Sequence, residues 1–114
     1  MIVKKQDAGK KENGGSCIVW EYDFKKPAVG FAVAKINGRY PLDGKKVVNK
    51  QCDLIYYIIS GSGVIHAQDG DFPVEAGDAM LLEKGSWYWV EGQELLVALP
   101  SVPEWTVDQY EEVY

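Results

Sequence analysis

Residues 54–68, which read LIYYIISGSGVIHAQ, decide the fold of this chain. The first six are leucine, isoleucine and tyrosine, so both alternating faces are apolar, and the pattern predicts a strand that is covered on both sides. Gly61 and Gly63 are typical of a turn, and residues 64–68 favour a second strand. The stretch therefore predicts two short strands joined by a tight turn.

Turn signals recur at short spacing along the rest of the chain, at Asn37-Gly38, Asp43-Gly44, Asp69-Gly70-Asp71, Gly77-Asp78, Lys84-Gly85 and Glu91-Gly92. Between them lie runs rich in β-branched and aromatic residues, at Cys17–Tyr22, 31–36, 54–60, 64–68, Ala79–Leu82, 87–90 and 95–99. Short strands at regular spacing with glycine turns are typical of an all-β sandwich or barrel.

The one helical signal lies near the C-terminus. Thr106 and Gln109 have the spacing of a capping box, which predicts a single turn of helix. An irregular tail held by Trp105 and Tyr110 is the alternative. We therefore expect a short C-terminal helical turn at most.

Length and composition predict one domain over residues 1–114 with a packed interior, because 46% of the residues are hydrophobic. The formal net charge is −5, from 17 acidic and 12 basic residues, which disfavours nucleic acid as a partner. The first residues lack the apolar segment of a signal peptide, and no apolar run is long enough to span a membrane. Since Cys17 and Cys52 are also expected to be free thiols, we expect a cytoplasmic protein without a membrane partner.

The glycines that follow the aromatic strand, together with Gly77-Asp78 and Gly85, resemble the paired motifs of the cupin superfamily over roughly residues 30–105. The resemblance implies an all-β, cupin-type jelly-roll barrel, also called a double-stranded β-helix. In the second motif Gly77 and Gly85 match in register, whereas Tyr88 stands where the family has a histidine.

The first motif matches in its glycines but not in its metal ligands. When its last glycine is placed on Gly61, the glutamate position falls on Leu54, and the histidine positions fall on Val47 and Asn49 or on the next residue of each. When it is placed on Gly63, Gly44 matches too, and the ligand positions become Lys50, Cys52 and Tyr56. Neither register supplies a histidine or a carboxylate.

The resemblance therefore implies a barrel without the metal of the family. A divalent transition metal needs several imidazole nitrogens or carboxylate oxygens that converge on one point. The chain has one histidine, His66. We accordingly predict no metal ligands and no cofactor.

A set of candidate site residues follows from strand parity and from the motif positions. Strict alternation puts Cys52, Leu54, Tyr56 and Ile58 on one face, which is the barrel interior in cupins, and the second motif adds Tyr88. The predicted ligand-binding residues are Asn49, Cys52, Tyr56, His66 and Tyr88. His66 is also the candidate catalytic base, although an exposed strand histidine is the simpler interpretation.

Three hypotheses for the function remain open at this stage. The first is a metal-independent barrel that binds a small polar, sugar-like molecule in a sensor or accessory role. The second is an isomerase or epimerase that acts without metal and uses His66 or a pocket tyrosine as the base. The third is a structural or regulatory oligomer with a closed interior. A homodimer is expected because Ile55, Tyr57 and Ile59 are apolar and point outward.

Overall fold

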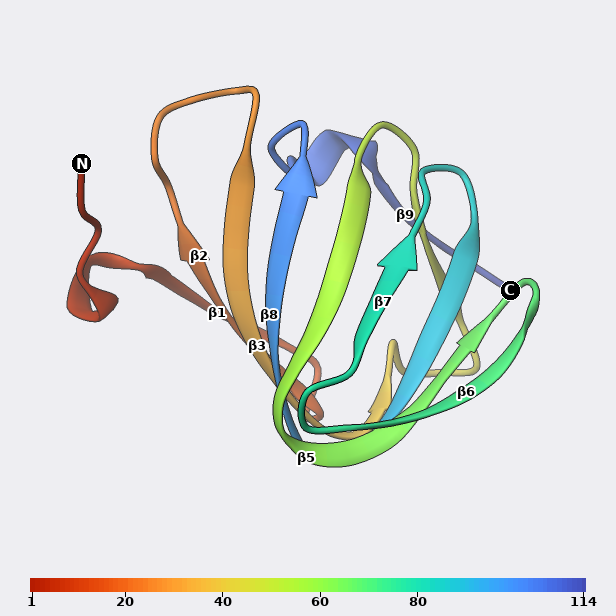
Figure 1. The fold of residues 1–114 in the computed structure, drawn as a ribbon. Helices are drawn as coiled ribbons and strands as arrows, with labels where there is room; N and C mark the ends of the chain where they lie inside the picture. Colours follow the sequence, from red (N-terminus) through yellow and green to blue (C-terminus); the bar gives the residue numbers. More distant parts are fainter.

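The computed structural model describes residues 1–114 as nine strands and two single turns of 3₁₀-helix (Figure 1). In chain order the elements are η1 (Lys5–Asp7), β1 (Gly9–Asn13), β2 (Cys17–Tyr22), β3 (Gly30–Tyr40), β4 (Lys46–Asn49), β5 (Asp53–Ala67), β6 (Gly70–Glu75), β7 (Ala79–Leu82), β8 (Trp87–Val102), η2 (Val107–Gln109) and β9 (Tyr110–Val113). No helix here has the length and apolarity needed to cross a membrane.

All nine strands belong to one antiparallel sheet that curls over on itself (Figure 1). One path runs β1-β2-β3-β8-β4-β9, and β5 joins it by pairing with β8, β6 and β7. β5 and β8 are the longest strands and pair from Asp53↔Val102 to Ala67↔Tyr88, so they form the spine of the barrel. A sheet closed in this way encloses a core between its two halves.

A pair of bulges in this spine changes which residues face the interior. The register between β5 and β8 shifts between Ile58 and Ser60, and again between Ser60 and Ser62. Glu94 on β8 and Gly61 on β5 have positive φ angles of 49° and 79° at this point. An extra residue in a strand moves every later side chain to the opposite face. The parity of buried residues therefore changes from even to odd along β5.

The burial pattern follows this change of parity. Leu54, Tyr56 and Ile58 are buried before the bulge, and Ile65 and Ala67 are buried after it. On β8 the buried positions change in the same way, from Tyr88 and Val90 to the odd-numbered residues 95 and 97. The core formed by these strands is a single cluster of sixteen buried residues.

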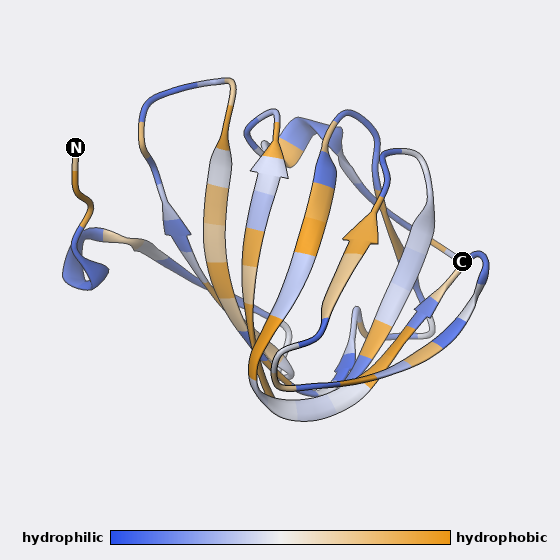
Figure 2. Ribbon diagram, in the orientation of Figure 1, coloured by the Kyte–Doolittle hydropathy of each residue, from blue (hydrophilic) through white to orange (hydrophobic).

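Hydrophobic residues lie along β3, β5, β7 and β8 (Figure 2), and some of them face outward. One outward row crosses five strands through paired residues, namely Trp20, Val33, Ala98, Tyr57 and Ala79. Beside this row Ile55, Ile59 and Leu81 are 39%, 44% and 54% exposed. The sequence predicts that both faces of residues 54–59 are covered. In the structure only the inner face is covered.

The all-β barrel predicted from the sequence is confirmed, with two corrections to its elements. Gly61 and Gly63 do not form a turn between two strands; they lie at the bend of the continuous strand β5. The C-terminal turn exists as η2, but Thr106 makes no side-chain capping bond, so the capping box is wrong. The Gln109 side chain instead accepts a hydrogen bond from the Gln51 backbone.

Gly61 is required at the bend, because a Cβ there would collide with the backbone carbonyl of Glu94 and its φ of 79° disfavours any other residue. We predict that Gly61→Ala lowers the free energy of unfolding by about 2 kcal/mol or more, as measured by denaturant unfolding. Gly15→Ala is the matched control, since nothing lies within 4 Å of a Cβ at Gly15 and its φ is not positive. Equal stability of the two variants would contradict this role for the bend.

Candidate functional site

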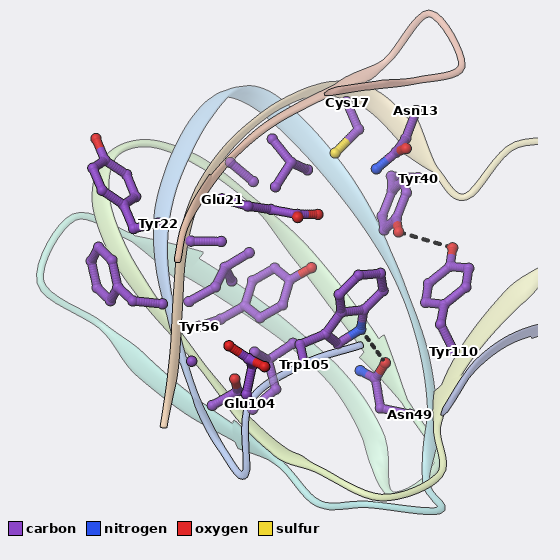
Figure 3. Close-up of a pocket in the computed structure, with 18 of the residues that line it drawn as sticks. Asn13, Cys17, Glu21, Tyr22, Tyr40, Asn49, Tyr56, Glu104, Trp105 and Tyr110 are labelled. Atoms are coloured by element: carbon purple, nitrogen blue, oxygen red, sulfur yellow. Dashed lines mark hydrogen bonds between the residues drawn. The ribbon is translucent and has the colours of Figure 1, made fainter. Parts of the chain in front are cut away.

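A cavity of about 290 Å³ opens at one end of the barrel, between β2, β3, β5, β8 and the segment that precedes β9 (Figure 3). Its wall is aromatic and mostly uncharged. The residues that supply its polar groups are Asn13, Cys17, Glu21, Asp23, Tyr40, Asn49, Tyr56, Tyr88, Ser101, Glu104, Trp105 and Tyr110.

Two pairs of phenols make up the deep part of the cavity. The Tyr56 hydroxyl donates to the Tyr88 hydroxyl at 3.3 Å, and the Tyr40 and Tyr110 hydroxyls lie 2.9 Å apart. Desolvation by burial raises the pKa of all four phenols above the ordinary value. They are therefore neutral at physiological pH; the Tyr56 hydroxyl donates its proton to Tyr88, and the Tyr110 hydroxyl donates its proton to the Glu112 carboxylate.

Asn49 links the barrel to the C-terminal segment. It lies at the end of β4, and its Oδ1 accepts hydrogen bonds from Trp105 Nε1 at 3.0 Å and from Gln109 Nε2 at 3.4 Å. Trp105 packs edge-to-face against Tyr110, with ring centroids 5.8 Å apart. These contacts hold the indole in the wall of the cavity, as Figure 3 shows.

Gly30 allows the same segment to lie against β3. A Cβ at this position would collide with Ser101 Oγ and would lie 3.0 Å from the Trp105 nitrogen and 3.1 Å from Glu104 Cα. The Glu104 backbone is also held by a hydrogen bond of 3.0 Å from its N–H to the Pro27 carbonyl. The position of Glu104 and Trp105 at the mouth is thus set by close backbone packing.

The charged residues that line the cavity are all acidic. Glu21 points inward from β2 and pairs with Lys11 at 3.1 Å, and Asp23 pairs with Lys25 at 3.6 Å. The Glu104 carboxylate lies at the mouth beside Trp105 (Figure 3) and makes no ion pair.

The structure brings together three of the five residues that the sequence singles out. Asn49, Tyr56 and Tyr88 line the cavity. Cys52 is fully buried but does not line it. The thiol that does line the cavity is Cys17, which faces inward from β2 opposite Ile36.

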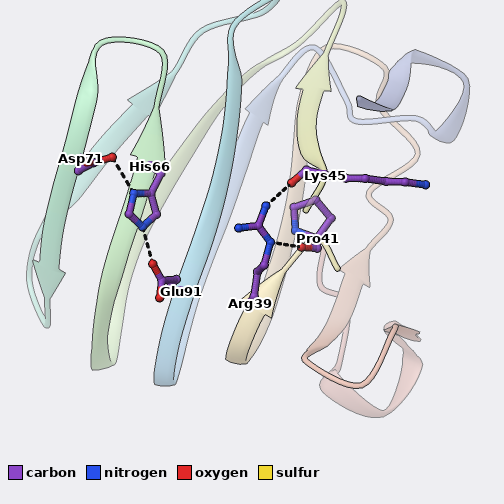
Figure 4. Close-up of polar contacts among 6 residues, drawn as sticks. All are labelled: Arg39, Pro41, Lys45, His66, Asp71 and Glu91. Atoms are coloured by element: carbon purple, nitrogen blue, oxygen red, sulfur yellow. Dashed lines mark hydrogen bonds and ion pairs between the residues drawn. The ribbon is translucent and has the colours of Figure 1, made fainter. Parts of the chain in front are cut away.

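His66 lies outside the cavity, which corrects its assignment to a barrel site. Its Nδ1 is 2.6 Å from Asp71 Oδ1 and its Nε2 is 2.7 Å from Glu91 Oε1 (Figure 4). The assignment fails because β5 contains an extra residue between Ile58 and Ser60, which reverses its parity, so that Ile65 faces inward instead.

The surroundings of His66 give it a structural role on the outer face. Its ring stacks on Trp89, with centroids 3.8 Å apart and planes at 13°, and the Arg39 guanidinium lies 3.7 Å above the same indole. Arg39 also donates to the Pro41 and Lys45 carbonyls at 3.1 and 2.8 Å (Figure 4). The stack ties β3, β5 and β8 together on their outer side.

Several cavity residues were not predicted from the sequence. They include Cys17, Glu21, Tyr40, Glu104, Trp105 and Tyr110. One usable signal exists for β2, where Cys17, Val19 and Glu21 share the inward face and place a carboxylate among apolar residues. The C-terminal residues carry no periodic pattern that indicates a cavity wall.

Comparison with solved structures identifies the fold of this barrel. No protein-family model matches the sequence, and no curated protein matches it. A protein from Klebsiella pneumoniae with a double-stranded β-helix domain matches with a TM-score of 0.71 and 13% identity, over 99% of this chain and 96% of that one. The chain has a cupin-type fold.

Two enzymes share this cupin-type fold at similarly low identity. Pac13, a nucleoside dehydratase, has a TM-score of 0.88 and 15% identity over 99% of this chain and 90% of that one. Ectoine synthase from P. lautus has a TM-score of 0.75 and 14% identity over 100% of this chain and 91% of that one. Variants of Streptomyces Pac13 with one tyrosine changed to phenylalanine, or one histidine changed to glutamine, are known with uridine.

The positions at which the cupin motifs carry metal ligands hold no histidine and no carboxylate in this chain. With the first motif placed on Gly61, its ligand positions fall on Leu54 with Val47 and Asn49, or on Leu54 with Val48 and Lys50. With the motif placed on Gly63 they fall on Lys50, Cys52 and Tyr56, and the second motif adds Tyr88. No group of three or more histidine, cysteine, aspartate or glutamate side chains is arranged to hold a metal ion. Neutral phenols and an amide are poor ligands for a divalent transition metal.

Burial of the four tyrosine hydroxyls and of the Cys17 thiol predicts that the protein loses stability at alkaline pH. Burial raises the pKa of Cys17 from 9.0 to about 12 and raises the pKa values of the four cavity phenols above 10.0. The unfolded chain loses these protons first, so the free energy of unfolding is unaffected below pH 9 and falls as the pH rises toward 12.

Denaturant unfolding at a series of pH values measures this loss, which amounts to about 1.4 kcal/mol for each unit of pKa shift of a fully titrated group. Cys17→Ala should make the decline shallower, because one of the titrating groups is removed. A denaturant midpoint that stays constant from pH 9 to 12 would contradict the raised pKa values of these groups.

Proposed function

We propose that this protein binds a small, polar, sugar-like molecule in the barrel cavity and acts without a metal, in a sensor or accessory role. The observation that carries the proposal is the hydrogen-bonded pair of Tyr56 and Tyr88 hydroxyls in a cavity that also contains Asn49 and Trp105. A few fixed hydrogen-bonding groups in an aromatic wall are typical of small-molecule sites.

The size and chemistry of the cavity favour a hydroxyl-rich ring. A volume of about 290 Å³ lies at the lower end of the range for small-molecule sites, which is about 300–1,000 Å³. The neutral phenols can both donate to and accept from ligand hydroxyls. The Trp105 indole, held by Asn49, supplies an apolar surface for the face of a ring.

The likeness to Pac13 supports uridine as the first probe. Two of the Pac13 variants known with uridine replace a tyrosine by phenylalanine. The cavity of the present chain likewise contains paired tyrosines. A nucleoside combines a sugar with a planar ring, so both the phenols and the indole would find a partner on it.

A metal-free isomerase or epimerase is the second candidate, and the fold's occurrence in enzymes such as Pac13 and ectoine synthase favours it. His66 is not available as its base, since it lies on the outer face. A pocket tyrosine would have to be the base, but burial raises the pKa of Tyr56 and Tyr88 and opposes that role. Binding without turnover is therefore the better supported proposal.

We predict that uridine binds to the wild-type protein and that Tyr56→Phe and Tyr88→Phe each weaken binding about five- to tenfold, as measured by isothermal titration calorimetry. Tyr57→Phe is the matched control, because Tyr57 lies next to Tyr56 on β5 and faces outward. Unchanged affinity in both cavity variants would remove the phenol pair from the site.

Metal independence is tested on the same samples. Binding should be the same before and after treatment with a chelator. One equivalent of a divalent metal that co-purifies and raises the melting temperature would overturn this part of the proposal.

We further propose that the protein is a homodimer that pairs through the apolar outer face of the sheet. The face spans five strands and three rows of side chains, so it measures roughly 24 Å by 20 Å. Two copies would bury roughly 1,000 Å² together, the lower limit for a specific interface. The free Cys17 and Cys52 thiols agree with a cytoplasmic location, which we also propose.

A charge in the centre of that face should separate the copies. We predict that Tyr57→Lys yields a monomer by size-exclusion chromatography with light scattering, whereas the wild-type protein elutes as a dimer. Lys84→Glu changes an exposed charge outside the apolar face and is the control. A wild-type protein that stays monomeric at high concentration would contradict the dimer.

A further inference from the structure

We propose that the cavity selects a ligand that carries a positively charged amine and rejects phosphorylated or carboxylated forms of the same ring. The inference rests on the proposed function and names the charge of the molecule that the site takes. It follows from the distribution of charge around the cavity.

Every charged residue that lines the cavity is acidic. Glu21, Asp23 and Glu104 line it, and no lysine, arginine or histidine does. Sites for phosphate or carboxylate are built from arginine or lysine side chains, or from the N-terminus of a helix. The cavity contains none of these cationic groups, and the nearby η2 is a single turn.

The rest of the lining does not offset this negative charge. Burial keeps the phenols of Tyr40, Tyr56, Tyr88 and Tyr110 neutral at physiological pH, and the Cys17 thiol likewise. These groups therefore contribute no charge, and the carboxylates of the lining determine which charge a ligand can bring.

Glu104 is the carboxylate that is free to meet a ligand cation. Glu21 and Asp23 already pair with Lys11 and Lys25. The Glu104 side chain makes neither an ion pair nor a hydrogen bond, although the Pro27 carbonyl and Gly30 fix its backbone. A carboxylate held at the rim of a partly enclosed cavity interacts with a ligand charge more strongly than one in open water.

Aromatic rings in the wall of the cavity add a second source of attraction for a cation. Trp105 follows Glu104 in the chain, and Tyr22 and Phe31 line the same cavity with their rings 5.7 Å apart. A cavity that combines a carboxylate with aromatic rings suits an ammonium group, through an ion pair and cation–π contacts. The same surroundings disfavour a phosphate, because no cationic side chain in the lining compensates for the charge that it would bring out of water.

Three probes that share the uridine ring system and differ in the group at the primary carbon test the inference: uridine, uridine monophosphate, and the uridine derivative in which an amine replaces the primary hydroxyl. By calorimetry at low salt, we expect the amine to bind about tenfold more tightly than uridine and the monophosphate about tenfold more weakly. The differences should shrink at high salt, because ions screen the charges at the open mouth.

In the Glu104→Gln variant the ratio of the affinity for the amine to the affinity for uridine should fall toward one. Asp108→Asn is the matched control, since it removes the same charge from an exposed residue of the same segment that does not line the cavity. It should keep the wild-type preference.

The outcomes separate this inference from the proposed function. Binding of uridine with no preference among the three probes, or a preference that survives in Glu104→Gln, overturns the charge selection alone. Failure of all three probes to bind overturns the proposed function together with it.

Discussion

The bulged bend shared by β5 and β8 is the constraint on which the rest of the structure depends. Gly61 and Glu94 adopt left-handed conformations where the two longest strands turn together. The bend lets one pair of strands serve both halves of the barrel. It also reverses which residues face inward, so that Tyr56 and Ile65 both lie in the interior although their numbers differ in parity.

Sequence patterns identified most of the strands and the barrel, because alternation and glycine spacing are local properties. β2 and β7 have the bounds that their residue pattern predicts, and Asn49, Tyr56 and Tyr88 line the cavity as motif position and parity indicate. These predictions hold because each depends on a segment that precedes the bend or is anchored by a motif glycine.

The predictions that failed depended on information that is not local. His66 follows the bend, and the number of extra residues that a bulge inserts cannot be read from alternation alone. Glu104 and Trp105 reach the cavity through contacts with Gly30, which is distant in sequence and carries no side chain to suggest a partner. The register of β5 and the close contact between Gly30 and the backbone of Glu104 and Trp105 become apparent only in the three-dimensional structure.

The arrangement of the C-terminal segment affects how the sequence of such a protein can diverge. The closed part of the barrel is built by β2 to β8, whereas Glu104, Trp105 and Tyr110 come from the residues that follow and are attached through Asn49 and Gly30. The scaffold thus supplies the Tyr56–Tyr88 pair, whereas the C-terminal segment, which pairs with β4, supplies Glu104 and Trp105. The tail can diverge to suit a new molecule while the scaffold stays as it is, which allows one barrel to acquire many specificities.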